Sequence, residues 1–566
     1  MGAAAGTLDP SFGTGGESVV DFGNSSDQLS SLALQGDRGI VLAGFSNLGG
    51  GLVFAAARLS ATGALDNSFG AEGKTVVPFR HTSEALDVAV DSQSRPVLAG
   101  FTYNPGGDQD FAVTRLKSDG NVDGSFGING KSIGDISSGS NDIAYAVALQ
   151  PDDKILAAGS TDTAGQRRFA TARLLDPSGN FDGAFGAGGR RVTSFGGLEG
   201  ATDMQLQPDG SIVLAGTTDV NGSRDFAVAR LKTDGTLDSQ FGDGGKSIGG
   251  FGPGSRDSGN AVALQPDGKI LVAGSTDVNG DDDFAVERLS VPSGNFDPSF
   301  GDGGKAVVNF RVGQSEAANE MALQPDGKIV LVGVSNHSIA VARLLPDGKV
   351  DPSFGTNGRS IIDLPTDFEA ATSVAIQPEG GIVVGAVALG TSSSAPADFT
   401  VIRLLGAAGG GGGSGGDPGG LNNGGGNPGG SGTPLVPVAS QLKLAPASFT
   451  PAKSGLSIAA KKKPAGTKVT YRLTGAATMA FGVERAIAGR VSGGKCRQES
   501  KTNRTGKRCS IYKPVKGSFA HPGEAGSNSF RFTGRVGGKP LAPGGYRLVG
   551  APAQGKPVHA SFRILP

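Results

Sequence analysis

The residue types that most often carry catalysis are sparse in this chain. Its four histidines stand far apart in the sequence and show neither metal-ligand nor catalytic spacing. No Gly-x-Ser-x-Gly nucleophile elbow and no phosphate-binding P-loop occurs. Tryptophan is absent, so the sequence gives little support to an aromatic sugar-binding platform. We therefore expect no enzyme and no cofactor. The histidines are His81, His337, His521 and His559.

Carboxylates are abundant, and two similar loops concentrate them. Residues 219–225 and 277–283 read Asp-Val-Asn-Gly-Ser-Arg-Asp and Asp-Val-Asn-Gly-Asp-Asp-Asp, which places oxygen ligands in tight turns, as calcium sites do. Both lack the twelve-residue EF-hand pattern, and Asp and Asn are also ordinary turn residues. Plain turns are the stronger interpretation and calcium the weaker one. The candidate calcium ligands are Asp219, Asp225, Asp277, Asp281 and Asp283.

The only two cysteines, Cys496 and Cys509, bracket a basic loop. An isolated pair in one module indicates a structural disulfide, with free thiols or a metal site as the alternatives. Closing a loop of this size would contribute about 3 kcal/mol. A disulfide implies an oxidising compartment, so we expect an extracellular or cell-surface location. Residues 1–6 show no secretory signal, and no apolar run is long enough to span a membrane.

A seven-fold repeat supplies the elements that must position any site. Each copy holds an Asp-x-x-Phe-Gly motif, a short β-run, a Gln-Pro-Asp-Gly type hairpin and two further β-runs, clearest at 225–231 and 263–274. Proline and glycine favour a tight turn between the flanking strands. Four short strands per copy predict one propeller blade per copy. The motif phenylalanines, 54 to 59 residues apart, are Phe12, Phe69, Phe126, Phe185, Phe241, Phe300 and Phe354.

Charge spacing predicts that the blades close into a ring. The arginine of each copy precedes the aspartate of the next Phe-Gly motif by eight or nine residues, as Arg58 precedes Asp66. Arg403 has no following aspartate and Asp9 no preceding arginine, and a ring would bring these two together. A linear array would need distinctive capping repeats, which are not apparent. We expect an Arg–Asp pair at each blade junction.

These segments resemble the delta-60 repeat family of bacterial β-propellers, whose copies carry the same Asp-x-Ser-Phe-Gly, Gln-Pro-Asp-Gly-Lys-Ile and Ala-Arg-Leu segments. The resemblance covers residues 7–405 and implies an all-β, seven-bladed propeller of four-stranded blades. It implies no catalytic residue.

Two further parts follow the repeats. Residues 406–435 are almost entirely Gly, Ser, Asn and Pro and predict a disordered linker. Residues 436–566 show alternating β patterns that predict an immunoglobulin-like sandwich. Motifs such as Phe481-Gly-Val-Glu-Arg485 and Leu541-x-Pro-Gly-Gly-Tyr-Arg-Leu548 are similar to a C-terminal module of secreted actinobacterial proteins. This part holds 23 Lys and Arg against three acids, a net charge of +20, whereas residues 1–435 carry −21.

A residue that recurs in all seven copies is one that every blade needs in order to fold, so a specific function must lie in the residues that differ between copies. The segments that differ between copies are loops such as Thr102–Asp110, Thr161–Arg168 and Ala388–Ala397. We expect a non-enzymatic extracellular or surface scaffold, with a protein or glycan ligand on the propeller. The basic module would contact anionic envelope polymers; its charges lack interleaved aromatics, so we do not expect nucleic acid. The alternative is a hydrolase or lyase with carboxylates in the central funnel.

Overall fold

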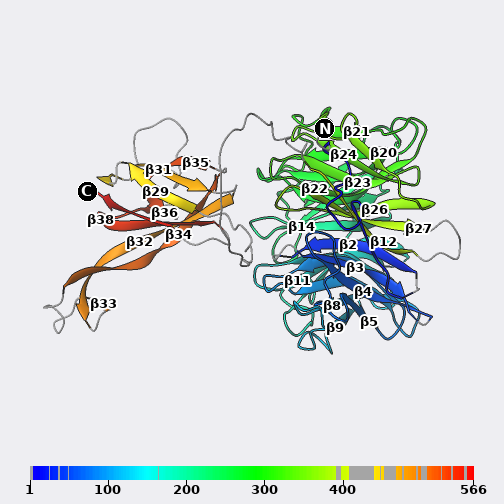
Figure 1. Ribbon diagram of the computed structural model, residues 1–566, viewed down its shortest axis with the longest axis horizontal. Coiled ribbons are helices and arrows are strands. Elements are labelled where there is room, and N and C mark those ends of the chain that lie inside the picture. The colour runs from blue at the N-terminus through cyan, green and yellow to red at the C-terminus, as the bar shows by residue number, and fades with distance from the viewer. Residues whose placement is uncertain are drawn as a thin grey trace, which may run out of the picture. The chain divides into compact units, whose positions relative to one another are not determined.

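Short runs of Val, Ile, Leu and Ala between glycine turns form strands along the chain, and the described residues contain no helix. The chain divides into two units, Met1–Gly420 and Leu421–Pro566. Figure 1 colours the first blue to green and the second yellow to red. The linker predicted at 406–435 lies, from 407 onward, outside the described residues. The computed structural model describes residues 4–565 except 24–25, 36–38, 49, 164, 390–396, 407–438, 446–447, 451–466, 474–476, 493–494, 499–506, 524–525, 537–538 and 553–557.

The first unit consists of seven antiparallel sheets of four strands each, so the predicted four strands per repeat are confirmed. Innermost strands of neighbouring sheets contact one another around the ring. They are β2 (Asp27–Leu34), β6 (Ser83–Val90), β10 (Asp142–Leu149), β14 (Glu199–Leu206), β18 (Asp257–Leu264), β22 (Glu316–Leu323) and β26 (Phe368–Ile376). The second strands are β3 (Ile40–Asn47), β7 (Pro96–Tyr103), β11 (Ile155–Thr163), β15 (Ile212–Thr218), β19 (Ile270–Thr276), β23 (Ile329–Ser335) and β27 (Ile382–Leu389).

The third strands are buried on both faces, which explains their nearly continuous Phe-Ala-Val-Ala pattern. They are β4 (Leu52–Leu59), β8 (Gln109–Arg115), β12 (Gln166–Leu174), β16 (Asp225–Leu231), β20 (Asp283–Leu289), β24 (Ser338–Leu344) and β28 (Asp398–Leu404). Outermost strands are only four residues long, which limits the exposed edge. They are β5 (Lys74–Val77), β9 (Lys131–Gly134), β13 (Arg190–Thr193), β17 (Lys246–Gly249), β21 (Lys305–Val308), β25 (Arg359–Ile362) and β1 (Glu17–Val20).

The ring closes through a sheet shared by the two ends of the repeat region. Strand β1 pairs with β28, so the N-terminal segment supplies the outermost strand of the last blade. Strand β2 contacts β26 on the inner side of the same junction. In Figure 1 the blue β2 accordingly lies beside the yellow-green β26. Each of the seven junctions also encloses a hydrophobic cluster drawn from two neighbouring blades.

One arginine per blade joins the recurring motifs. Arg58 Nε lies 2.8 Å from Asp66 Oδ2, and its Nη1 lies 3.0 Å from Gln35 Oε1 of the hairpin. Its guanidinium lies over the ring of Phe69, 4.9 Å from the centroid. Nη1 also donates to Ser118 O of the next blade at 2.7 Å. The arginine thus connects the hairpin, the Phe-Gly loop and the neighbouring blade.

The predicted Arg–Asp pairs form in every blade, but their place differs from the prediction. In six blades the aspartate lies in the loop that follows its arginine's strand, so the pair belongs to one blade. Other guanidinium nitrogens of Arg58 and Arg288, for example, reach carbonyl oxygens of the next blade. The closing pair is confirmed, with Arg403 Nη2 2.9 Å from Asp9 Oδ2. The other pairs are Arg115–Asp123, Arg173–Asp182, Arg230–Asp238, Arg288–Asp297 and Arg343–Asp351.

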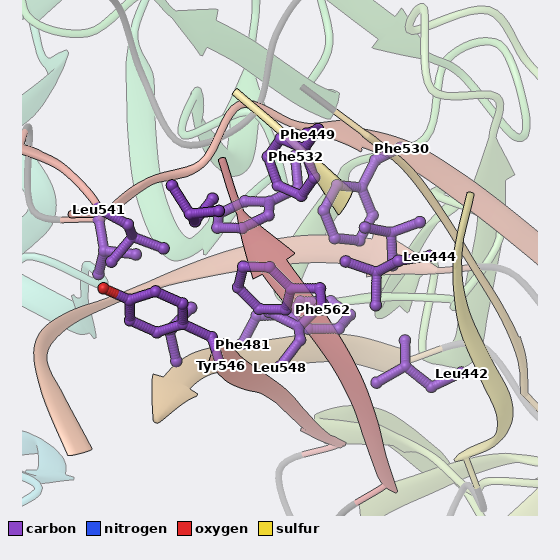
Figure 2. Packing of buried hydrophobic residues seen from close by; sticks show 14 of the residues in the cluster. Leu442, Leu444, Phe449, Phe481, Phe530, Phe532, Leu541, Tyr546, Leu548 and Phe562 are labelled. Atoms are coloured by element: carbon purple, nitrogen blue, oxygen red, sulfur yellow. The ribbon is translucent and has the colours of Figure 1, made fainter. Parts of the chain in front are cut away.

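Two sheets enclose one hydrophobic core in the second unit, an arrangement compatible with the predicted sandwich. Figure 2 shows Phe449, Phe481 and Phe562 among the side chains that meet there. Tyr546 Oη donates to Ala542 O at 2.7 Å, a contact of the kind seen in tyrosine corners. One sheet holds β29 (Ala439–Ala445), β31 (Thr467–Leu473) and β35 (Gly526–Phe532). The other holds β30 (Ser448–Phe449), β39 (Val558–Ile564), β38 (Gly544–Pro552), β32 (Ala477–Ser492), β33 (Lys495–Gln498) and β34 (Arg508–Gly523), and β36 (Arg535–Val536) pairs with β37 (Lys539–Pro540).

We expect Arg403→Ala to lower the free energy of unfolding of the propeller by about 3 kcal/mol, because it leaves the carboxylate of Asp9 without its partner at the closing blade. Urea unfolding of the full chain, followed by circular dichroism, measures this. Arg256→Ala is the control, since Arg256 is 72 % exposed in its pair with Asp277 and should cost less than about 1 kcal/mol. Equal effects of the two variants would contradict the role of the closing pair.

A second prediction concerns Glu287, which is fully buried at the junction of β20 and β17, where the other blades carry Ala, Thr or Ile. Burial, with the charges of Asp257 and Asp225, raises the pKa of Glu287 to about 8. An unfolded glutamate ionises near pH 4.5, so the free energy of unfolding falls as pH rises from 4.5 to 8, by on the order of 5 kcal/mol.

Glu287→Ala should remove this part of the pH dependence and raise the melting temperature at pH 8 more than at pH 5. Thermal unfolding of both proteins at the two pH values measures the difference. Exposed Glu72→Ala serves as the control. Parallel pH profiles for wild type and Glu287→Ala would show that this carboxyl does not titrate as described.

Candidate functional site

The two ends of the propeller differ in chemistry. The motif face is the end that carries the Gln-Pro-Asp-Gly hairpins and the Phe-Gly loops. Many of its polar groups accept hydrogen bonds from the buried arginines. Its turns need glycine, as at Gly268 with a φ of 89°. The loop face is the opposite end, where the innermost strands begin. It carries the loops between second and third strands and the loops between blades, which are the segments that vary.

The candidate calcium ligands lie on the loop face, where several join neighbouring loops. Asp219 Oδ1 accepts Leu198 N at 2.6 Å, Asp277 Oδ1 accepts Arg256 N at 2.6 Å, and Asp281 Oδ2 accepts Gly313 N at 2.8 Å. Asp225 and Asp283 accept the amides of Asn221 and Asn279, both at 2.9 Å. The five are not brought together into one site, and they hold the loops in place.

Two other acidic groups gather within the described residues. The carboxylate oxygens of Asp110, Asp135 and Asp142 lie within 4.8 Å of one another, and so do those of Asp21, Asp27 and Asp398. Both groups stand at blade junctions of the loop face. Burial and the neighbouring carboxylates raise the pKa of Asp398 to about 6. Sequence spacing could not reveal these groups, because their members come from different blades.

Part of this acidity is structural. The first residue of an innermost strand accepts a backbone N–H from the loop before it: Phe22 N lies 2.8 Å from Asp27 Oδ2, and Ile136 N lies 2.6 Å from Asp142 Oδ2. The same contact recurs at Glu199, Asp257 and Glu316. A buried carboxylate at this position therefore satisfies a backbone donor that would otherwise lack a partner.

Carboxylates also line the channel enclosed by the innermost strands. Each of these strands has a β-bulge at its middle, which turns a side chain toward the channel. Next to the bulge stand Asp87, Asp203 and Glu320, from alternate blades. Burial raises the pKa of Asp87 to about 6 and that of Asp203 to about 7. The pKa of Glu320 is raised well above its ordinary range by burial and by the charges of Asp203 and Asp87.

These channel carboxylates hold the ring together. Asp87 Oδ2 accepts Val147 N of the next blade at 2.7 Å, and Asp203 Oδ2 accepts Val262 N at 2.7 Å. Ser373 Oγ accepts Leu32 N at 3.1 Å in the corresponding position. Side chains at the bulge thus satisfy donors on the free edge of the neighbouring innermost strand. A hydrolase or lyase with its site in the central funnel would need carboxylates that converge as these do. Asp87 and Asp203, however, each already accept a backbone N–H of the next blade.

A pocket of about 540 Å³ opens on the loop face beside the channel. Its inner wall comes from the innermost strands, with Tyr145, Thr202 and Asn260. Its outer rim carries both signs of charge, and Arg167 Nε lies 3.6 Å from Asp162 Oδ1. Asp203, one of the channel carboxylates, is the residue after Thr202 in β14.

Exposed apolar side chains recur on the loop face, and one of them, Leu198, lines this pocket. Val312 is 91 % exposed and Leu198 is 55 % exposed, and both lie in loops between blades. A single exposed apolar side chain is normal on a protein surface, but several on one face indicate an interaction surface. The loop-face members are Leu48, Tyr103, Leu198, Val220, Val278, Val312 and Leu389.

The remaining sequence candidates lie elsewhere. The predicted disulfide is confirmed, because Cys496 of β33 and Cys509 of β34 are bonded. His521 lies 2.7 Å from the Tyr471 hydroxyl, and His337 packs against Phe368. No histidine joins an acidic group that could hold a metal within the described residues. No helix that could cross a membrane is present in the described part of the chain.

Comparisons with known proteins agree with this architecture. Six segments match the family model described as "Domain of unknown function (DUF5122) beta-propeller": 35–69, 97–126, 150–185, 207–241, 265–300 and 324–354. Among curated proteins none matches the chain.

Solved structures with a likeness to the chain are distant. One is the polysaccharide lyase Uly1, with 12 % identity over 67 % of this chain and 90 % of that one, at a TM-score of 0.40. Another is the β-propeller domain of the Trilobed protease from Pyrococcus furiosus, with 9 % identity over 67 % and 95 % and a TM-score of 0.36. A fungal alcohol oxidase of the AA5 family in complex with copper has 13 % identity over 99 % and 100 % and a TM-score of 0.40. None of these bears on activity, and the six family matches support a β-propeller repeat family for the first unit.

Proposed function

We propose that the chain is a non-enzymatic binding protein whose propeller holds a protein ligand on its loop face. The observation that carries this proposal is the contrast between the two ends. The motif face engages many of its polar groups in the arginine contacts, whereas the loop face exposes seven large apolar side chains and holds a pocket of about 540 Å³ that one of them, Leu198, lines. A glycan ligand would call for more aromatic surface than Tyr103 and Tyr145 supply.

The second unit supports a surface location for the protein. Among its described residues, exposed cations outnumber acids, and Arg547 forms an ion pair with Glu484. Such cations suit an anionic envelope polymer. The Cys496–Cys509 disulfide fits an oxidising, extracellular environment. We also propose that the propeller is of the delta-60 repeat type and that the second unit is a module of the kind found in secreted actinobacterial proteins. The exposed cations are Lys443, Lys468, Arg485, Lys507, Arg508, Lys513, Lys516, Lys539 and Arg563.

The loop face can be tested with apolar-to-acid variants of the full chain. We expect Leu198→Asp and Val312→Asp to abolish cross-linking of the chain to partners in a surface-protein fraction, because each places a charge in the apolar group. Ile128→Asp is the matched control, since Ile128 is 81 % exposed on the motif face. Cross-links detected by mass spectrometry should be unchanged in the control. Loss in the control alone would move the binding site to the other end.

The enzymatic alternative rests on the convergence of Asp87, Asp203 and Glu320 in the channel. A hydrolase or lyase would lose its activity in Asp203→Asn, whereas a ring contact would survive in part because the amide oxygen still accepts Val262 N. Screening wild type and variant against polysaccharide and peptide substrates, with melting temperature measured alongside, separates the two. We expect no turnover by either protein. Turnover that Asp203→Asn removes without unfolding would replace the binding proposal.

A further inference from the structure

The channel mouth has a strongly one-sided charge. The seven innermost strands together contain ten acidic residues and no lysine, arginine or histidine. Glu84, Asp87, Asp203 and Glu320 stand at half-buried positions of these strands. Glu84 lies near the Tyr145 side chain: burial raises the pKa of this tyrosine, and the charge of Glu84 adds to the shift. The innermost strands end on the motif face in aliphatic residues, so the acidity lies toward the loop face.

A narrow acidic channel concentrates negative potential at its opening. Low-dielectric walls on all sides weaken screening, so the potential at the mouth attracts a cation more strongly than the same charges on an open surface would. Burial is the main cause of the raised pKa values of Asp87 and Asp203, and the charge of Asp87 raises the pKa of Asp203 further. A cationic side chain in the mouth would offset the repulsion between the ionised carboxylates.

The pocket provides the entrance for such a side chain. Its inner wall is formed by Tyr145, Glu199, Gly200, Thr202, Ser258 and Asn260 and offers oxygen acceptors, and Glu199 already pairs with Arg168 Nη1 at 3.2 Å. Both arginines of the pocket are exposed: Arg167 stands near the start of β12, and Arg224 lies in the loop before β16. Leu198, which also lines the pocket, is 55 % exposed at the rim and gives an aliphatic neighbour a contact.

Resting on the proposed function, we infer that the loop face binds a basic protein segment of mixed cationic and aliphatic residues, with one Lys or Arg side chain inserted through the pocket toward the acidic channel. Charge complementarity selects this occupant, since the channel would repel an acidic peptide or a nucleic acid. The exposed apolar group supplies the contact area that a charge pair alone lacks.

The test uses the full chain and three synthetic twelve-residue peptides: one of Lys and Leu, one of Glu and Leu, and one of Lys and Ser. Fluorescence polarisation at 150 mM NaCl measures binding. The Lys/Leu peptide should bind, the Glu/Leu peptide should not, and the Lys/Ser peptide should bind at least about tenfold more weakly because it lacks apolar contacts. Binding of the Glu/Leu peptide as tight as that of the Lys/Leu peptide would overturn the inference.

Variants locate the inserted cation. Glu84→Gln should weaken Lys/Leu binding by about tenfold, and Ser258→Lys should abolish it by placing a cation in the pocket. Matched controls on the motif face are Glu72→Gln and Ser118→Lys, both at exposed positions, and neither should change binding. Melting temperatures confirm that all four variants fold.

Two failures can be told apart. Lys/Leu binding that Val312→Asp abolishes but Ser258→Lys leaves intact would keep the loop face as the binding surface and overturn the inserted cation. No binding of any peptide by wild type would overturn the basic partner, while cross-linking to surface proteins that Leu198→Asp abolishes would still support the proposed function. Equal loss in Ser258→Lys and Ser118→Lys would overturn the location at the channel mouth.

Discussion

A buried guanidinium in each blade sets the conditions for the rest of the propeller. Arg58 needs an aspartate, a glutamine, a stacked phenylalanine ring and a carbonyl of the next blade, and the chain supplies all four at fixed spacing. Removing any partner would leave a poorly solvated charge, which is costly. The recurring Gln-Pro-Asp-Gly, Ala-Arg-Leu and Asp-x-x-Phe-Gly segments are thus explained by one interaction. Arg403 and Asp9 extend it across the two ends of the repeats.

This constraint divides the two faces between folding and binding. Since the arginine contacts fix the sequence of the motif face, variation is left to the loops at the opposite end. There Asp219, Asp277 and Asp281 tie loop to loop, and the apolar side chains remain exposed. Function in such a ring is expected in what differs between blades, and those differences gather around one channel mouth.

Much of the fold followed from the sequence, because its signals are local. The blades were predicted from the turn residues of the hairpins and from the spacing of Arg58 and Asp66. Ring closure was predicted from Arg403 and Asp9, each of which lacks a partner at that spacing along the sequence. The site did not follow, because its residues are distant in sequence. The bulges that turn Asp87, Asp203 and Glu320 inward leave no pattern along a strand, and Asp110, Asp135 and Asp142 meet only across a junction. The carboxylates of Asp219 and Asp277, for which the sequence indicates calcium as the weaker interpretation beside plain turns, accept backbone N–H groups of neighbouring loops.

Hydrogen–deuterium exchange on the full chain, with and without the Lys/Leu peptide, tests the division of the two faces most directly. The account predicts slower amide exchange on binding in loops 194–198, 219–224 and 309–315 and at the start of β14, with the hairpins of the motif face unchanged. Protection confined to the Gln-Pro-Asp-Gly hairpins or to the Phe-Gly loops would contradict it, because binding would then use the surface that the arginines organise.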